Sequence, residues 1–143
     1  MKPLRALLPL SCLAALVTLC IGQNGGDPFA VSADKVEKIK AALPASTQVP
    51  VKAKHEVLVF SKTAGFRHGS IPVGVECMKQ LGAKSGLFNV THSEDAEMFK
   101  PESLAKFDAV IFLNSTGSIF KDSPSGEDTL KKSLIDFVKG GKG

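Results

Sequence analysis

Two short, continuous apolar runs constrain the fold of this chain more than any other feature of its sequence. Residues 57–60 and 109–113 are apolar at every position, so neither run alternates between apolar and polar side chains. Strands that are apolar on both faces are typical of parallel sheets, which are covered by helices on each side. The stretch 88–91 fits a further strand of the same sheet.

Helical patterns alternate with these strands. Stretches 71–84 and 129–139 have apolar residues at three- and four-residue intervals, as amphipathic helices do, and 98–107 is expected to hold a helical turn or two after Pro101. The order predicts a flavodoxin-like, doubly wound parallel sheet in a three-layer α/β/α arrangement. The chain ends where a fourth strand would begin, so we expect a domain that is incomplete at its C-terminus, with an exposed apolar edge.

The first 22 residues have the layout of a secretory signal. Lys2 and Arg5 precede a stretch at 7–21 that is apolar apart from two hydroxyl residues, and this stretch is short for a membrane span. Cleavage after Gly22 would release an exported protein, periplasmic or extracellular. An uncleaved anchor is one alternative, and lipid attachment at Cys20 is another, although the neighbouring Leu does not fit a lipobox.

Removal of this segment changes the charge and the cysteine count. It holds two of the 18 basic residues and none of the 14 acidic ones, so the mature chain is nearly balanced, at about +2. Basic and acidic residues are mixed, which argues against nucleic-acid binding, and the membrane is expected to contact only the signal segment. Only Cys77 remains, so no internal disulfide forms.

Residues 23–54 are expected to be a linker with a short helix at 34–43, followed by the domain at 55–143.

Two polar loops follow the first and third predicted strands, at 61–70 and 114–118. In a flavodoxin-like order these strands are neighbours at the point where the strand order reverses, which is where ligands bind in open α/β sheets. The position favours a crevice with Arg67 as a fork of donors and His68 as an acid or base. Asn114 and Thr116 would face them. The alternative is that these are solvated loop residues and that Asn114 only holds its loop together.

Other candidate residues carry weaker signals. His55 and His92 have no partner at a metal-ligand spacing, so neither a metal site nor a cofactor is expected. Cys77 is interpreted as a packing residue rather than a nucleophile. Phe120, unlike most of the phenylalanines, falls in a loop rather than at a core position.

The stretch 57–72, VLVFSKTAGFRHGSIP, resembles the opening of a ThuA-like (trehalose utilisation) domain. The stretch 107–117 resembles its third strand and following loop, and 38–44 resembles the linker of exported members. The resemblance covers 55–143 and implies a fold like that of class I glutamine amidotransferases, with a role in sugar or disaccharide use. It adds Thr63, Gly65 and Phe66 to the candidate pocket. It does not imply amidotransferase activity, since no glutaminase cysteine is expected in this chain.

Three functions remain open at this point. The first is binding or processing of a small carbohydrate by an exported domain. The second is a flavodoxin-like FMN-binding electron carrier, which the absence of Trp and Tyr disfavours because flavin rings usually stack on aromatic side chains. The third is a non-catalytic interaction module, and whether the protein is an enzyme is left undecided.

Overall fold

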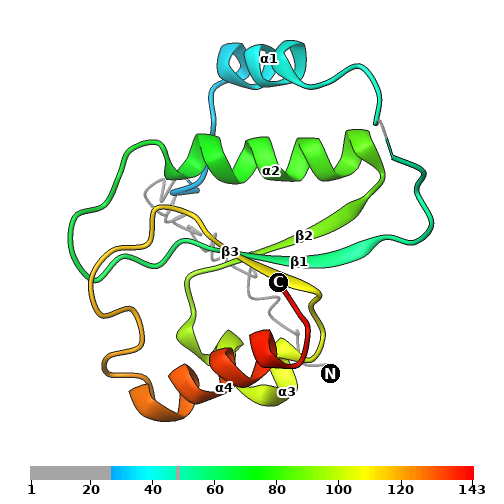
Figure 1. Ribbon diagram of the computed structural model, residues 1–143. Helices are drawn as coiled ribbons and strands as arrows, with labels where there is room; N and C mark the ends of the chain where they lie inside the picture. The colour runs from blue at the N-terminus through cyan, green and yellow to red at the C-terminus, as the bar shows by residue number, and fades with distance from the viewer. Residues whose placement is uncertain (1–26, 48) are drawn as a thin grey trace, which may run out of the picture.

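The computed structural model describes residues 27–47 and 49–143, and it contains a three-stranded parallel sheet between helices (Figure 1). The strands are β1 (His55–Phe60), β2 (Phe88–Ser93) and β3 (Ala109–Phe112), in the order β2-β1-β3. This arrangement confirms the predicted flavodoxin-like α/β fold, in which β1 and β3 are neighbours. The signal segment predicted at 1–22 lies outside the described residues.

The central strand β1 explains why its sequence is apolar throughout. Leu58, Val59 and Phe60 are completely buried, and Val57 nearly so. Leu58 and Phe60 point into one apolar cluster, whereas Val57 and Val59 point into another on the opposite face. Both faces of the strand are therefore inside the protein, as a parallel sheet covered by helices requires.

One face of the sheet is covered by α2 (Ile71–Ser85), with α1 (Ala33–Ala42) packed outside it (Figure 1). Ile71 is buried against the sheet. Gly82 lets the helix approach β2 closely, because a Cβ atom there would lie 2.6 Å from the carbonyl oxygen of the first residue of β2. A larger residue at this position would push the helix away from the sheet.

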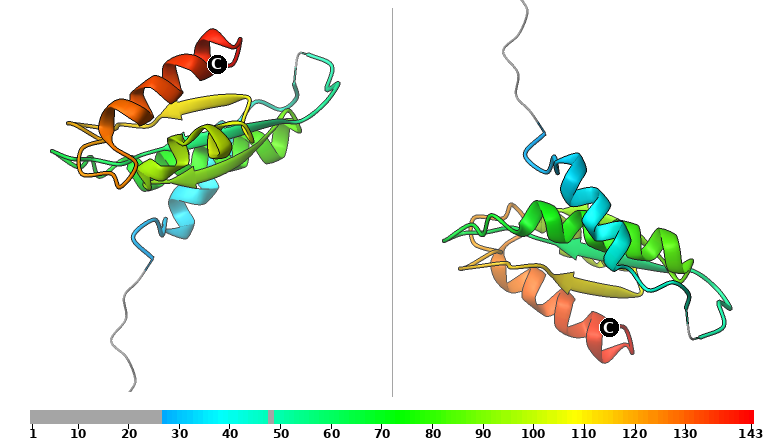
Figure 2. Two further views of the ribbon diagram at one scale, coloured as in Figure 1. Left: turned by 90° about the horizontal axis from the view of Figure 1, so that it is seen from below. Right: turned by 90° about the horizontal axis from the view of Figure 1, so that it is seen from above.

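The opposite face is covered by η1 (Ala96–Phe99), α3 (Pro101–Leu104) and α4 (Glu127–Lys139). Figure 2 shows α4 and α1 on opposite sides of the sheet, which gives the three layers. Phe120 corrects a sequence-based expectation: it is buried in this core, and its ring centroid lies 4.8 Å from that of Phe99. The loop after β3 thus contributes an anchor to the core.

The element boundaries differ from the predicted ones by one or two residues at most ends. β1 begins at His55 rather than 57, and β2 continues to Ser93 rather than 91, because the two strands pair along their whole length. α4 begins at Glu127, two residues earlier than predicted.

After α4 the chain returns to β3, where the Val110 amide donates to the carbonyl oxygen of Gly143 at 2.8 Å. Among the described residues, no helix is long and apolar enough to cross a membrane.

Candidate functional site

The two predicted loops meet at the carboxyl ends of β1 and β3. Thr63 and Thr116 form a parallel bridge, and the amide of Ala64 donates to the carbonyl oxygen of Thr116 at 2.7 Å. The Thr116 hydroxyl donates to the Phe66 carbonyl oxygen, also at 2.7 Å. At Gly65, a Cβ atom would lie 3.6 Å from the same hydroxyl. The predicted juxtaposition of the loops is therefore present, and Thr116 is one of the residues that joins them.

A polar hollow of about 650 Å³ lies between the two loops, and we name it the loop groove. Hydroxyl, ammonium and carboxylate groups line it, so it offers both donors and acceptors of hydrogen bonds. Of the residues singled out from the sequence, only Thr63 lines it. The lining consists of Lys62, Thr63, Ala64, Gly117, Ser118, Lys121 and Asp122.

The other sequence-predicted residues lie beside the loop groove. Asn114 donates its side-chain amide to the Ser70 hydroxyl at 3.0 Å, so it ties the loop after β3 to the start of α2. Phe66 is 72% exposed, and the exposed His68 ring meets it edge-on at a centroid distance of 4.9 Å. Arg67 points away from this pair, toward β2. The structure thus brings Phe66 and His68 together and separates Arg67 from His68.

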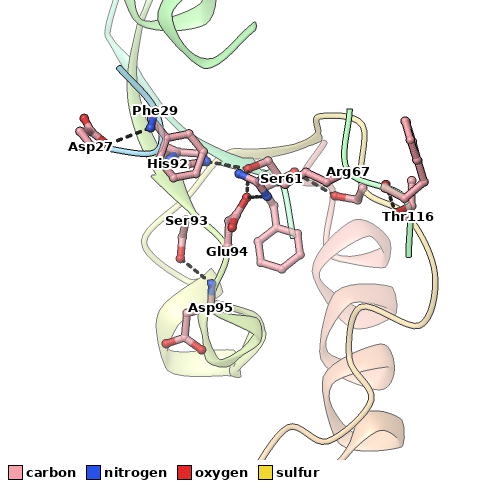
Figure 3. Close-up of polar contacts among 12 residues, drawn as sticks. Asp27, Phe29, Ser61, Arg67, His92, Ser93, Glu94, Asp95 and Thr116 are labelled. Carbon is pink, nitrogen blue, oxygen red and sulfur yellow. Dashed lines mark hydrogen bonds and ion pairs between the residues drawn. The ribbon is translucent and has the colours of Figure 1, made fainter. Parts of the chain in front are cut away.

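Arg67 belongs to a polar cluster that sequence reasoning missed, formed with Ser61, His92 and Glu94 and named here the edge network (Figure 3). Its guanidinium donates to a Glu94 carboxylate oxygen at 2.7 Å. The same oxygen accepts from the Ser61 hydroxyl at 2.8 Å, and His92 Nε2 lies 2.7 Å from that hydroxyl. Glu94 is the hub of the cluster, because it holds Arg67 and Ser61 at once.

The hydrogen bonds of the edge network determine the tautomer of His92. An ionised carboxylate only accepts, so Ser61 gives its single proton to Glu94 and must accept a proton from His92 Nε2. Burial lowers the pKa of His92 below its ordinary value of 6.5, and the charge of Glu94 opposes this shift only in part. We therefore infer a neutral imidazole with the proton on Nε2 and a lone pair on Nδ1.

The segment before α1 reaches across the edge network. The Phe29 ring lies edge-on to His92 at a centroid distance of 4.4 Å, and the Arg67 guanidinium lies 5.4 Å from the same ring. A hydrogen bond of 2.9 Å from the Phe29 amide to Asp27 shapes the turn that presents the ring (Figure 3). This part of the predicted linker is consequently packed against the domain.

A second carboxylate fixes the loop after β3 from its other end. Glu97 of η1 accepts from the Ser123 hydroxyl, from the Ser125 hydroxyl at 2.5 Å and from Lys100 at 2.7 Å. The bond from Lys100, followed by those from the two serines, lowers the pKa of Glu97 to about 2. The loop that lines the groove is therefore anchored at Thr116 on one side and at Glu97 on the other.

Sequence reasoning missed Ser61, His92 and Glu94 because their contact depends on the pairing of β1 with β2. Val59 pairs with His92, and the amide of Ser61 donates to the carbonyl oxygen of Ser93 at 3.2 Å. The signal that was available is positional: Ser61 and Glu94 each follow a strand, and the carboxyl ends of adjacent parallel strands lie at the same edge of the sheet.

Other features of the described chain contribute less to a site. No group of three or more His, Cys, Asp or Glu side chains in the described ranges is placed to hold a metal ion. Cys77 is half-buried on α2 and does not line the loop groove. A smaller, mostly apolar hollow of about 250 Å³ lies near the amino ends of the strands, between residues 44–47 and the end of α2.

Fold and site together define a class of protein. The strand order reverses between β1 and β3, and the loop groove lies beyond the carboxyl ends of these two strands, as ligand sites do in doubly wound α/β domains. Residues 56–143 match the family model ThuA, described as trehalose utilisation, which is a class I glutamine amidotransferase-like domain. The chain belongs to the ThuA family. No curated protein and no solved structure gives a significant match to it.

Proposed function

We propose that this chain is an exported ThuA-family domain that binds a small carbohydrate in the loop groove. The observation that supports this most is the groove itself, a polar hollow between two loops joined at Thr63 and Thr116, at the reversal of strand order. The family's description links its members to trehalose utilisation. Sugars present many hydroxyls, each of which both donates and accepts hydrogen bonds.

The groove offers the groups that such a ligand needs. The Thr63 and Ser118 hydroxyls donate and accept, the Lys62 ammonium donates, and the Asp122 carboxylate accepts. The exposed ring of Phe66, in the same loop, gives an apolar face against which the C–H face of a sugar ring packs. The proposed ligand site combines a few convergent polar groups with one aromatic surface.

His68 is the proposed acid or base beside this site. Its exposed imidazole packs against Phe66, and in the described part of the chain no carboxylate bonds its side chain. A neutral imidazole carries one N–H donor and one nitrogen acceptor, so it can give a proton to a sugar hydroxyl or carbonyl or take one from it. The proposed role of Arg67 is different. Its bond to Glu94 orients the loop, and its remaining N–H donors stay available to solvent.

A binding and turnover assay with the full chain tests this proposal. Calorimetric titration with a panel of disaccharides and keto-sugars is expected to find a ligand, and Phe66→Ala is expected to weaken it by about tenfold through the lost apolar contact. His68→Gln should retain binding while lowering any turnover. As a control, Lys106→Gln changes an exposed lysine just before β3, at the amino ends of the strands and away from the groove, and should behave as wild type.

Two results would contradict the proposal. If the panel gives no binding and the folded protein instead associates with a macromolecule, the domain is an interaction module. If Phe66→Ala and His68→Gln both bind and turn over as wild type does, the ligand lies elsewhere. The export component has a separate test: N-terminal sequencing of exported protein should begin at Gln23, whereas a blocked, lipid-modified Cys20 would indicate an anchored lipoprotein.

A further inference from the structure

We infer that the carbohydrate taken up by the loop groove is negatively charged: a sugar with a phosphate ester or a sugar acid. This inference rests on the proposed function and adds the substrate class. It arises from two lysines, Lys62 and Lys121, that come from different loops and line the same hollow. Two cationic residues lining one polar groove favour an anionic ligand there.

Neither lysine is neutralised within the described chain. No ion pair or side-chain hydrogen bond there involves Lys62 or Lys121, and Asp122 is the single carboxylate among the lining residues. The charged residues of the lining therefore leave an excess of one positive charge. Lys62 is also half-buried, so it is partly withdrawn from water and gains more from an anionic ligand than a fully exposed lysine would.

Nearby cations differ from this pair because they already have partners. Arg67 pairs with Glu94 and Lys100 with Glu97, each at 2.7 Å. Their charges are used inside the protein, in the edge network and in the anchor of the loop after β3. The unneutralised positive charge at this site consequently lies in the groove itself.

Asp122 distinguishes a charged sugar from a bare anion. It is one of the residues that line the groove, and its backbone is in the left-handed region, with φ of 63°. A carboxylate there repels an inorganic anion but accepts a hydrogen bond from a sugar hydroxyl. The groove thus combines a cationic pair for the charged substituent with an acceptor and two hydroxyls, at Thr63 and Ser118, for the sugar.

The test compares sugars that differ in charge, using the full chain and calorimetric titration. Trehalose, trehalose 6-phosphate, glucose, glucuronate and inorganic phosphate are the probes, so that the phosphate and the carboxylate source are separated. At least one charged sugar is expected to bind about tenfold more tightly than its neutral counterpart, the gain of one charge-assisted hydrogen bond. The preference should shrink as salt is added.

Charge-neutral variants locate the effect. Lys62→Gln and Lys121→Gln should each weaken binding of the charged sugar more than binding of the neutral sugar, and Lys106→Gln should alter neither. Equal binding of charged and neutral sugars would overturn this inference alone. Phosphate that binds as tightly as trehalose 6-phosphate would overturn it in favour of a bare anion site. If no sugar of either kind binds, the proposed function fails as well.

Discussion

Gly117 is the position where a single added carbon should disturb the loop groove most. Its backbone is left-handed, with φ of 74°, and a Cβ atom there would lie 2.9 Å from the carbonyl carbon of Ala64 and 3.0 Å from its oxygen. Gly117→Ala therefore adds a left-handed penalty of about 1–2 kcal/mol. The two loops must also separate, which weakens the Ala64–Thr116 hydrogen bond by about 1 kcal/mol.

Together these contributions predict a loss of about 2–3 kcal/mol from the free energy of unfolding, which corresponds to a melting temperature lower by roughly 10 °C. Circular dichroism of the full chain during heating measures this. Gly69→Ala is the matched control, because Gly69 lies in the partner loop, its φ is outside the left-handed region, and no atom lies within 4 Å of its Cβ position. If the Gly117→Ala protein has the same melting temperature as the Gly69→Ala protein and wild type, the close approach of the two loops is refuted.

Three further predictions concern the polar contacts around the groove. Ser61→Ala removes the buried hydroxyl shared by Glu94 and His92 and should lower the free energy of unfolding in urea by about 1–3 kcal/mol; an unchanged midpoint would contradict the edge network. His92 should titrate below pH 6.5 by NMR because burial lowers its pKa, and a midpoint above 6.5 would exclude the neutral imidazole. Lys100 and two serines hold the pKa of Glu97 at about 2, below its ordinary value of 4.5. Their stabilisation is therefore complete above pH 4.5 and lost as the pH falls toward 2, so Glu97→Gln should flatten this acid-dependent loss in a denaturation series, and an unchanged acid profile would contradict it.

The strand order could be predicted from the sequence because two of its strands, β1 and β3, are apolar throughout, and β1 is buried on both faces. Leu58 and Val59 face opposite apolar clusters. Because neither face of such a strand meets water, its sequence is apolar at every position instead of alternating, and this identifies a parallel sheet. A parallel sheet with helical crossovers then permits few arrangements, and the flavodoxin-like one places β1 beside β3. The meeting of the two loops at Thr63 and Thr116 followed from that order alone.

The contacts within the site could not be predicted in the same way. Arg67 turns to Glu94 rather than to the groove because the register of β1 and β2 places that carboxylate 2.7 Å away, and no local pattern encodes this distance. Phe29 lies in a segment without periodicity, so its packing on His92 is a purely tertiary contact. Phe120 lies in a loop and was not predicted at a core position, but the loop turns inward there and its ring packs beside Phe99.

Mapping a bound sugar onto the chain by NMR tests directly whether a carbohydrate binds in the loop groove. Amide shifts would be followed while the tightest ligand of the carbohydrate panel is titrated into the full-length protein. We expect the largest changes in the two loops of the groove, at residues 62–68 and 114–122. Changes confined to 44–47 and 81–87, around the smaller apolar hollow, would contradict it, as would a titration that shifts no amide at all.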